Sequence, residues 1–146
     1  MTQTKLDTVR LQGLARAFIG SASLFAAIDV KLFGAVAAGH DTVDAFARHA
    51  NIQTIQAERL MTMCAALGLL RHEQGRYRNS PDVDRFLVEG SGSYAGDWLL
   101  FNRPDWDGWG RLTGLLERAE APQLIGTAYE DMTVDDARRY HRATSS

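Results

Sequence analysis

The chain has 146 residues, 45% of them hydrophobic and 23% charged, which is a globular composition and excludes a disordered tail. Its formal net charge of −2 gives no overall positive field for nucleic acid or an anionic membrane, so we expect neither partner. The single cysteine, Cys64, excludes an internal disulfide and a multi-cysteine metal site, and it favours a cytoplasmic location. No apolar run reaches the roughly 18 residues of a membrane span.

The first stretch, residues 5–37, is predicted to be helical because its apolar side chains recur at alternating steps of three and four. This seam consists of Leu11, Leu14, Phe18, Ser21, Phe25, Ile28 and Leu32. Gly20 and Ser21 lie half way along it, so we expect two helices that meet at a kink. The seam is too apolar for a lone surface helix, and it must pack either on the rest of the domain or on a second copy.

Residues 38–80 predict a winged-helix unit, in which two helices precede a two-stranded hairpin. Each helix has a residue that favours its start and one that favours its end, in chain order Thr42, Asn51, Thr54 and Gly68. The hairpin turn is expected at Gln74 and Gly75.

Residues 81–146 are predicted to be helical again, with breaks at residues 90–93 and at Pro104. One helix is expected over residues 94–101, one over 106–118 and one from Thr133 through Arg142. Strands are therefore confined to the hairpin, and the sequence predicts a single mainly α domain over residues 1–146.

Residues 86–92 (FLVEGSG) bear some likeness to a glycine-rich cofactor loop. The spacing differs, because Glu89 directly precedes Gly90, and no alternation of strands and helices follows. We interpret this segment as a helix end and a turn, and we expect no cofactor-binding residue in the chain.

Catalytic and metal-ligating residues are not expected either. The four histidines, His40, His49, His72 and His141, show no metal-binding spacing. Cys64 follows Met63 on an apolar helix face, so we expect a buried, unreactive thiol.

Aromatic residues gather in the last third of the chain. Tyr94, Trp98 and Phe101 share one predicted helix face, and Trp106 and Trp109 share another. Such side chains either pack in a core or form a flat wall for a planar ligand. Both interpretations hold together if a further domain completes the pocket.

The winged-helix pattern also raises an alternative function, a DNA-binding transcription regulator that reads DNA with the helix after residue 53. The polar face of that helix offers little for phosphate or base contacts. The hairpin adds a modest basic patch: Arg71, Arg76 and Arg78 against Glu73.

Four segments, in order, resemble the small-molecule O-methyltransferases of secondary metabolism. They are residues 24–33 (LFAAIDVKLF), 59–70 (RLMTMCAALGLL), 75–80 (GRYRNS) and 138–143 (RRYHRA). The set covers nearly the whole chain and resembles the N-terminal dimerisation domain of that family, a helical winged-helix fold.

The resemblance implies a homodimer whose interface includes Leu11, Leu14, Phe18, Phe25, Ile28 and Leu32. It also implies that Trp98, Phe101, Trp106 and Trp109 cover a small aromatic or polyketide-like acceptor. Enzymes of this family transfer a methyl group from S-adenosylmethionine to a hydroxyl, often with a histidine as general base. Their catalytic domain has no counterpart in these 146 residues, so we expect the chain alone to be a fragment without activity.

Overall fold

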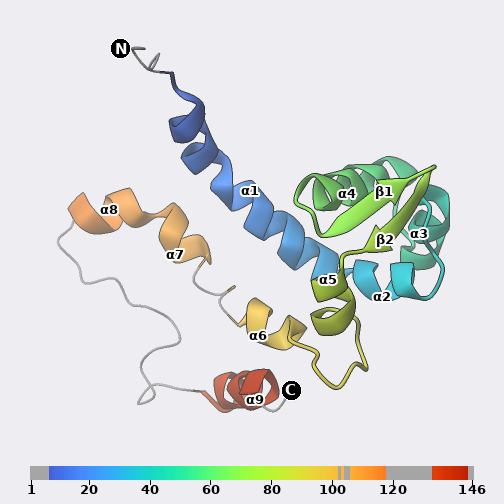
Figure 1. The fold of residues 1–146 in the computed structure, drawn as a ribbon. Coiled ribbons are helices and arrows are strands. Elements are labelled where there is room, and N and C mark those ends of the chain that lie inside the picture. The colour runs from blue at the N-terminus through green and yellow to red at the C-terminus, as the bar shows by residue number, and fades with distance from the viewer. Residues whose placement is uncertain (1–6, 102, 104–105, 118–132, 145–146) are drawn as a thin grey trace, which may run out of the picture. The chain divides into compact units, whose positions relative to one another are not determined.

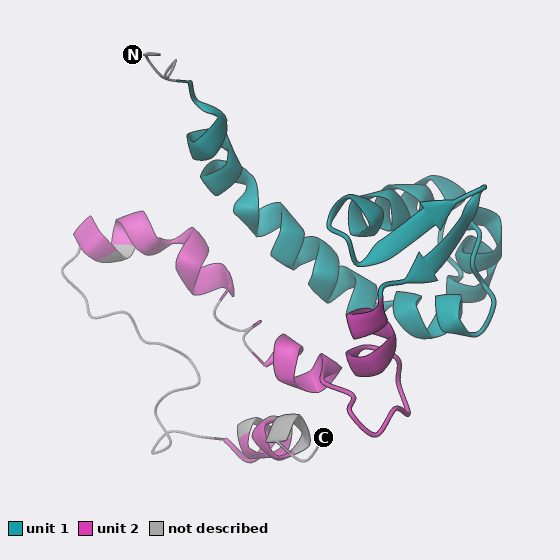
Figure 2. Ribbon diagram, viewed as in Figure 1, with its two compact units in different colours: residues 1–80 teal, residues 81–146 magenta. Residues whose placement is uncertain are grey.

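The computed structural model describes residues 7–101, 103, 106–117 and 133–144. The chain divides into two compact units, residues 1–80 and residues 81–146 (Figure 2). Helices dominate both units, and the strands that the structure describes form one small antiparallel pair (Figure 1). This confirms the predicted mainly α fold with a short two-stranded wing.

The first helix, α1 (Val9–Asp29), is continuous, so the expected kink at Gly20 is wrong. Gly20 lies against Leu67, the residue that follows α4 (Thr54–Ala66), since a Cβ built at Gly20 would lie 3.4 Å from Leu67 Cδ2. The chain breaks later, at Lys31, whose φ of 57° precedes α2 (Leu32–Ala37). The C-terminal end of α4 therefore packs close to α1 at Gly20.

By length and composition, α1 could also cross a membrane. Only Arg16 is charged among residues 11–28, so the expectation that no stretch reaches a membrane span is wrong for this helix. Core helices of soluble proteins meet the same criteria, and Ala27 and Ile28 near the end of α1 are buried.

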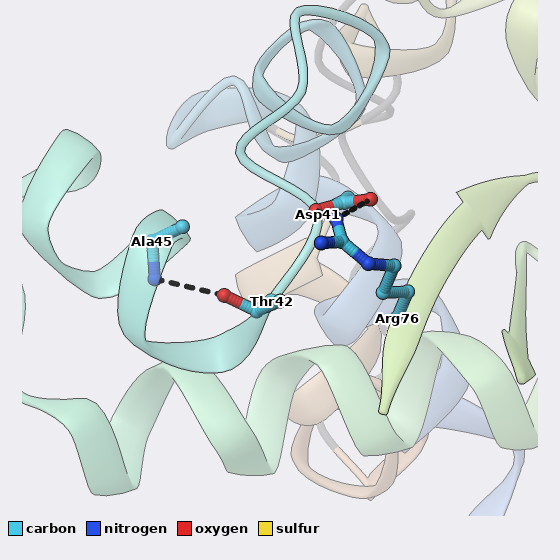
Figure 3. Close-up of polar contacts among 4 residues, drawn as sticks. All are labelled: Asp41, Thr42, Ala45 and Arg76. Atoms are coloured by element: carbon cyan, nitrogen blue, oxygen red, sulfur yellow. Dashed lines mark hydrogen bonds and ion pairs between the residues drawn. The ribbon is translucent and has the colours of Figure 1, made fainter. Parts of the chain in front are cut away.

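The two helices of the predicted winged unit are α3 (Val43–Ala50) and α4. Thr42 caps α3 by accepting a hydrogen bond from the Ala45 amide at 3.2 Å (Figure 3). Asn51 ends α3 in the left-handed conformation. Gly68, with φ 75°, follows α4, so these three boundaries are confirmed. The N-cap of α4 is Gln53 and not Thr54, because the extended backbone before the helix ends one residue earlier than predicted.

The hairpin pairs β1 (Leu70–Glu73) with β2 (Arg76–Asn79). Gln74 and Gly75 both have positive φ, 52° and 77°, as a tight turn with matched strand twist requires. The predicted turn is therefore confirmed at both residues.

The core of the first unit lies between the helices and the hairpin. α3 packs against α4, α4 against β1, and α2 against β2. Its fully buried large side chains are Leu32, Phe33, Phe46, Met61 and Cys64. Asn79 of β2 donates a hydrogen bond from Nδ2 to the Phe33 carbonyl at 2.9 Å, and this bond ties the hairpin to α2.

The second unit contains α5 (Pro81–Phe86), α6 (Gly96–Leu100), α7 (Trp106–Gly110), α8 (Leu112–Glu117) and α9 (Val134–Thr144). α6 packs against α9. Two expectations are wrong in detail. The helix predicted over residues 94–101 begins at Gly96, and the one over 106–118 is interrupted at Arg111. Glycines at 108, 110 and 114 weaken a continuous helix there.

Candidate functional site

Three aromatic rings meet where α6 packs on α9. The Trp98 and Phe101 rings are parallel within 2°, with centroids 6.0 Å apart. Phe101 also meets Tyr140 of α9 edge to face, with centroids 5.9 Å apart. Trp98 is 48% exposed, whereas Phe101 and Tyr140 are half-buried. The cluster therefore presents one open indole surface on a base of two packed rings.

Two of the predicted acceptor residues lie elsewhere in the second unit. Trp106 and Trp109 belong to α7, and both are exposed, Trp109 to 65%. Sequence reasoning missed Tyr140 as a member of the aromatic group, because it is some forty residues from Phe101 in the chain. Its place on the apolar side of the helix over residues 138–143 was the available signal.

The predicted interface residues fall into two groups along α1 and α2. Leu11, Leu14 and Phe18 are exposed, and Figure 1 shows the N-terminal half of α1 extending away from α2–α4 and the hairpin. Ile28 and Leu32 are buried within the first unit, so a second copy is not needed to cover them.

Phe25 lies between these groups and is half-buried. The exposed apolar surface that Leu11, Leu14 and Phe18 form is therefore restricted to the first half of α1.

The segment over residues 86–92 is a helix end and a turn, as interpreted from its sequence. α5 ends at Phe86, and Gly90 has φ 85°. The Ser91 hydroxyl donates to the Arg85 carbonyl at 2.9 Å, and the Ala95 amide donates to the Phe86 carbonyl at 2.8 Å. These bonds fold the segment back on α5 and leave it without the strand that precedes a cofactor loop in a sheet domain.

Tyr94, which follows this turn, has a structural role. Burial, with a smaller contribution from Glu89 and Asp97, raises the pKa of Tyr94. The Tyr94 hydroxyl lies directly over Gly96, where the structure leaves no room for a Cβ. Gly96 thus lets the Tyr94 ring cover the start of α6.

Cys64 is fully buried, and this burial raises the pKa of its thiol to about 11. Its predicted position on the apolar face of the helix is confirmed. A thiol with this pKa remains protonated at neutral pH and is a poor nucleophile.

Three histidines, His40, His49 and His72, stack on other aromatic rings. His40 and His49 stack with centroids 4.0 Å apart, and His72 stacks on Tyr77 at 4.3 Å. Within the described part of the chain, no three His, Cys, Asp or Glu side chains gather in a group that could hold a metal ion.

The hairpin is joined to the start of α3 by an ion pair. Arg76 Nη1 donates to both carboxylate oxygens of Asp41, at 2.8 and 2.9 Å (Figure 3). The Tyr77 amide donates to the Asp41 carbonyl at 2.7 Å. The hydrogen bond from Arg76 is the main cause of a lowered Asp41 pKa.

Known proteins are similar to this chain in sequence and in fold. A 3-hydroxy-5-methyl-1-naphthoate 3-O-methyltransferase from Streptomyces sahachiroi is 38% identical over 113 residues, which cover 77% of this chain and 32% of the relative. The N,N-dimethyltransferase OxyT from Streptomyces rimosus is 31% identical over 144 residues, covering 90% of this chain and 42% of OxyT. The chain thus spans less than half the length of these relatives.

A solved structure of an O-methyltransferase family protein from Burkholderia thailandensis superimposes with a TM-score of 0.76 and 29% identity. The superposition covers 97% of this chain and 42% of that one. The family description that matches residues 12–89 is that of the O-methyltransferase dimerisation domain. This chain therefore belongs to the O-methyltransferase dimerisation-domain family.

Proposed function

We propose that the chain forms a homodimer through the exposed first half of α1. The observation that carries this proposal is the apolar surface of Leu11, Leu14 and Phe18 on a helix of a dimerisation-domain family. Burial of apolar surface gains about 25 cal/mol per Å², so a second copy that covers these side chains stabilises both chains. An isologous pairing of the same surface from each copy is the simplest arrangement.

The second part of the proposed function is to cover the acceptor of a small-molecule O-methyltransferase in secondary metabolism. Trp98, supported by Phe101 and Tyr140, offers a flat apolar surface that suits a small aromatic or polyketide-like acceptor. Trp106 and Trp109 of α7 add exposed indole rings to the same unit. The S. sahachiroi relative is named for a naphthoate, which is a planar aromatic acid.

The methyl donor of the longer protein is proposed to be S-adenosylmethionine, which supplies an electrophilic methyl group when bound. The residues described here do not fit this cofactor, because the glycine-bearing turn at residues 86–92 is folded back on α5 by its own hydrogen bonds. The chain by itself is therefore proposed to be catalytically inactive, with its winged-helix arrangement of α3, α4 and the hairpin serving as scaffold.

We also propose a cellular location for the protein. The buried, protonated thiol of Cys64 is compatible with a reducing cytoplasm, where we place the protein.

The alternative of a DNA-binding regulator gains no support from the family match or from the relatives, which are methyltransferases.

A charge placed in the exposed half of α1 tests the homodimer. Phe18→Asp is expected to convert the dimer to monomer, because an unpaired carboxylate in an apolar interface costs several kcal/mol. Sedimentation equilibrium over a range of protein concentrations measures the dissociation constant. Arg16→Gln is the matched control, since it also changes the charge by −1 and lies about 160° around the same helix from Phe18.

The dimer proposal predicts that the control stays dimeric and folded. A monomeric wild-type chain, or equal dissociation of both variants, would contradict an interface at Phe18.

Truncation of the open indole tests the acceptor surface in the longer methyltransferase. Trp98→Ala is expected to raise the acceptor KM about tenfold, because it removes most of the apolar contact with a planar ring. The KM for S-adenosylmethionine should stay within about twofold, because the donor is proposed to bind outside this domain. Steady-state kinetics with each substrate varied in turn separates the two, and an equal rise in both KM values would count against the acceptor role.

A further inference from the structure

The hairpin carries a pair of arginines directly opposite each other. In the antiparallel register, Arg71 faces Arg78 and Glu73 faces Arg76. Because side chains alternate between the two faces of a strand, these four residues share the outer face, and all four are exposed. Directly opposite residues have Cβ atoms about 4.5–5.5 Å apart. The Arg71 and Arg78 guanidinium groups can therefore reach the same ligand.

The third arginine of this face is already paired. Arg76 donates to both oxygens of Asp41, so its charge is neutralised by a carboxylate from outside the hairpin (Figure 3). Arg78 affects Asp41 only through its charge, as a minor cause of the lowered Asp41 pKa. Among the residues that the structure describes, no carboxylate forms an ion pair with Arg71 or Arg78 within 4.0 Å.

Like charges that face each other destabilise a hairpin, and an anion bound between them removes that repulsion. Each guanidinium has five N–H donors in a planar fork, the geometry that matches phosphoryl oxygens. A phosphate monoester carries a charge of about −1.5 to −2, enough to neutralise both arginines, whereas a carboxylate neutralises one. We propose that Arg71 and Arg78 form a binding site for a doubly charged phosphoryl group, either free phosphate or a monoester.

Nucleic acid fits this surface less well. A phosphodiester carries one charge per group, and binding to it relies on many contacts along a basic surface. Here the chain has a net charge of −2, Arg76 is neutralised by Asp41, and Glu73 lies on the same face. The positive charge is thus restricted to the two opposed arginines, which suits one compact dianion.

A phosphate titration of the whole ¹⁵N-labelled chain tests the site at constant ionic strength in NaCl. The arginine Nε–Hε signals of Arg71 and Arg78 should shift and saturate. Arg71→Gln and Arg78→Gln should each weaken binding about tenfold, because each removes one charged fork. Arg48→Gln, at an exposed arginine in the last turn of α3, is the matched control and should leave binding unchanged. Glu73→Gln should strengthen binding about twofold, since it removes a nearby negative charge.

A short phosphoserine peptide distinguishes the sources of the phosphoryl group. Tighter binding than that of inorganic phosphate indicates a protein-borne monoester, and equal or weaker binding indicates the free ion. Peptide binding should fall about fourfold from pH 7.5 to 5.5, because the second phosphate pKa is about 6 and the dianion is lost. Shifts that do not saturate, an equal loss in Arg48→Gln, or tighter binding of a single-stranded oligonucleotide would overturn the proposal.

Discussion

The two halves of α1 carry the same kind of apolar side chains and lie in opposite surroundings. Leu14 and Phe18 in the first half are 64% and 60% exposed, whereas Ile28 near the end is 7% exposed and packs in the core of the first unit. An apolar helix face thus shows that something must cover it. It does not show whether the cover is the same chain or a second copy.

The largest expected effect on stability comes from a buried residue of the same apolar seam, Leu32, which lies in α2 just after α1. Leu32→Ala should lower the free energy of unfolding by about 2–5 kcal/mol, because Leu32 is fully buried and its removal leaves a cavity. Leu14→Ala is the same substitution in the exposed half and should cost less than about 1 kcal/mol in the isolated monomer. Urea denaturation at low protein concentration, where the proposed dimer would dissociate, measures both. If Leu14→Ala lowered the free energy of unfolding as much as Leu32→Ala, the distinction between an exposed and a buried part of the seam would be wrong.

A second pair compares glycines in the two halves of α1. Gly20→Leu should destabilise the chain by about 1–3 kcal/mol, because the new side chain must displace Leu67. Gly13→Leu meets nothing within 4 Å and should stabilise the helix by about 0.5–1 kcal/mol through helix propensity. Urea denaturation of both variants measures the difference. Equal effects would show that α4 does not approach α1 at Gly20.

The smallest effect concerns the core at alkaline pH. Burial raises the pKa of Cys64 from its usual 9.0 to about 11, so the folded state holds the thiol proton more tightly than the unfolded state. This contribution to stability is present below pH 9 and is lost as pH rises through 11. Unfolding measured across this range should show a decline that Cys64→Ala removes. An unchanged slope in that variant would mean that other groups cause the decline.

Local boundary residues account for most of what could be predicted about the fold. Thr42, Asn51 and Gly68 each set a helix end by their own side chain or backbone conformation, and the structure confirms them. Gln74 and Gly75 do the same for the hairpin turn. These features depend on a few neighbouring residues, so the sequence contains all the information that they need.

Two of the errors occur where a distant segment decides. Gly20 is a sequence signal for a kink, yet α1 stays continuous and packs there against Leu67, the residue that follows α4. Tyr140 joins Trp98 and Phe101 only because α9 packs on α6. In neither case does the sequence around the residue indicate which distant segment it will contact.

The sequence by itself determined the order of the main elements, the helix boundaries at Thr42, Asn51 and Gly68, the hairpin turn, and the family to which residues 12–89 belong. Only the tertiary structure decided which apolar residues of the first helix are core and which remain exposed, and which arginine of the hairpin pairs with Asp41. The physical reason is the separation along the chain over which each interaction acts. Capping and turn preferences act over a few residues, whereas burial and ion pairing depend on segments that meet only after the chain has folded.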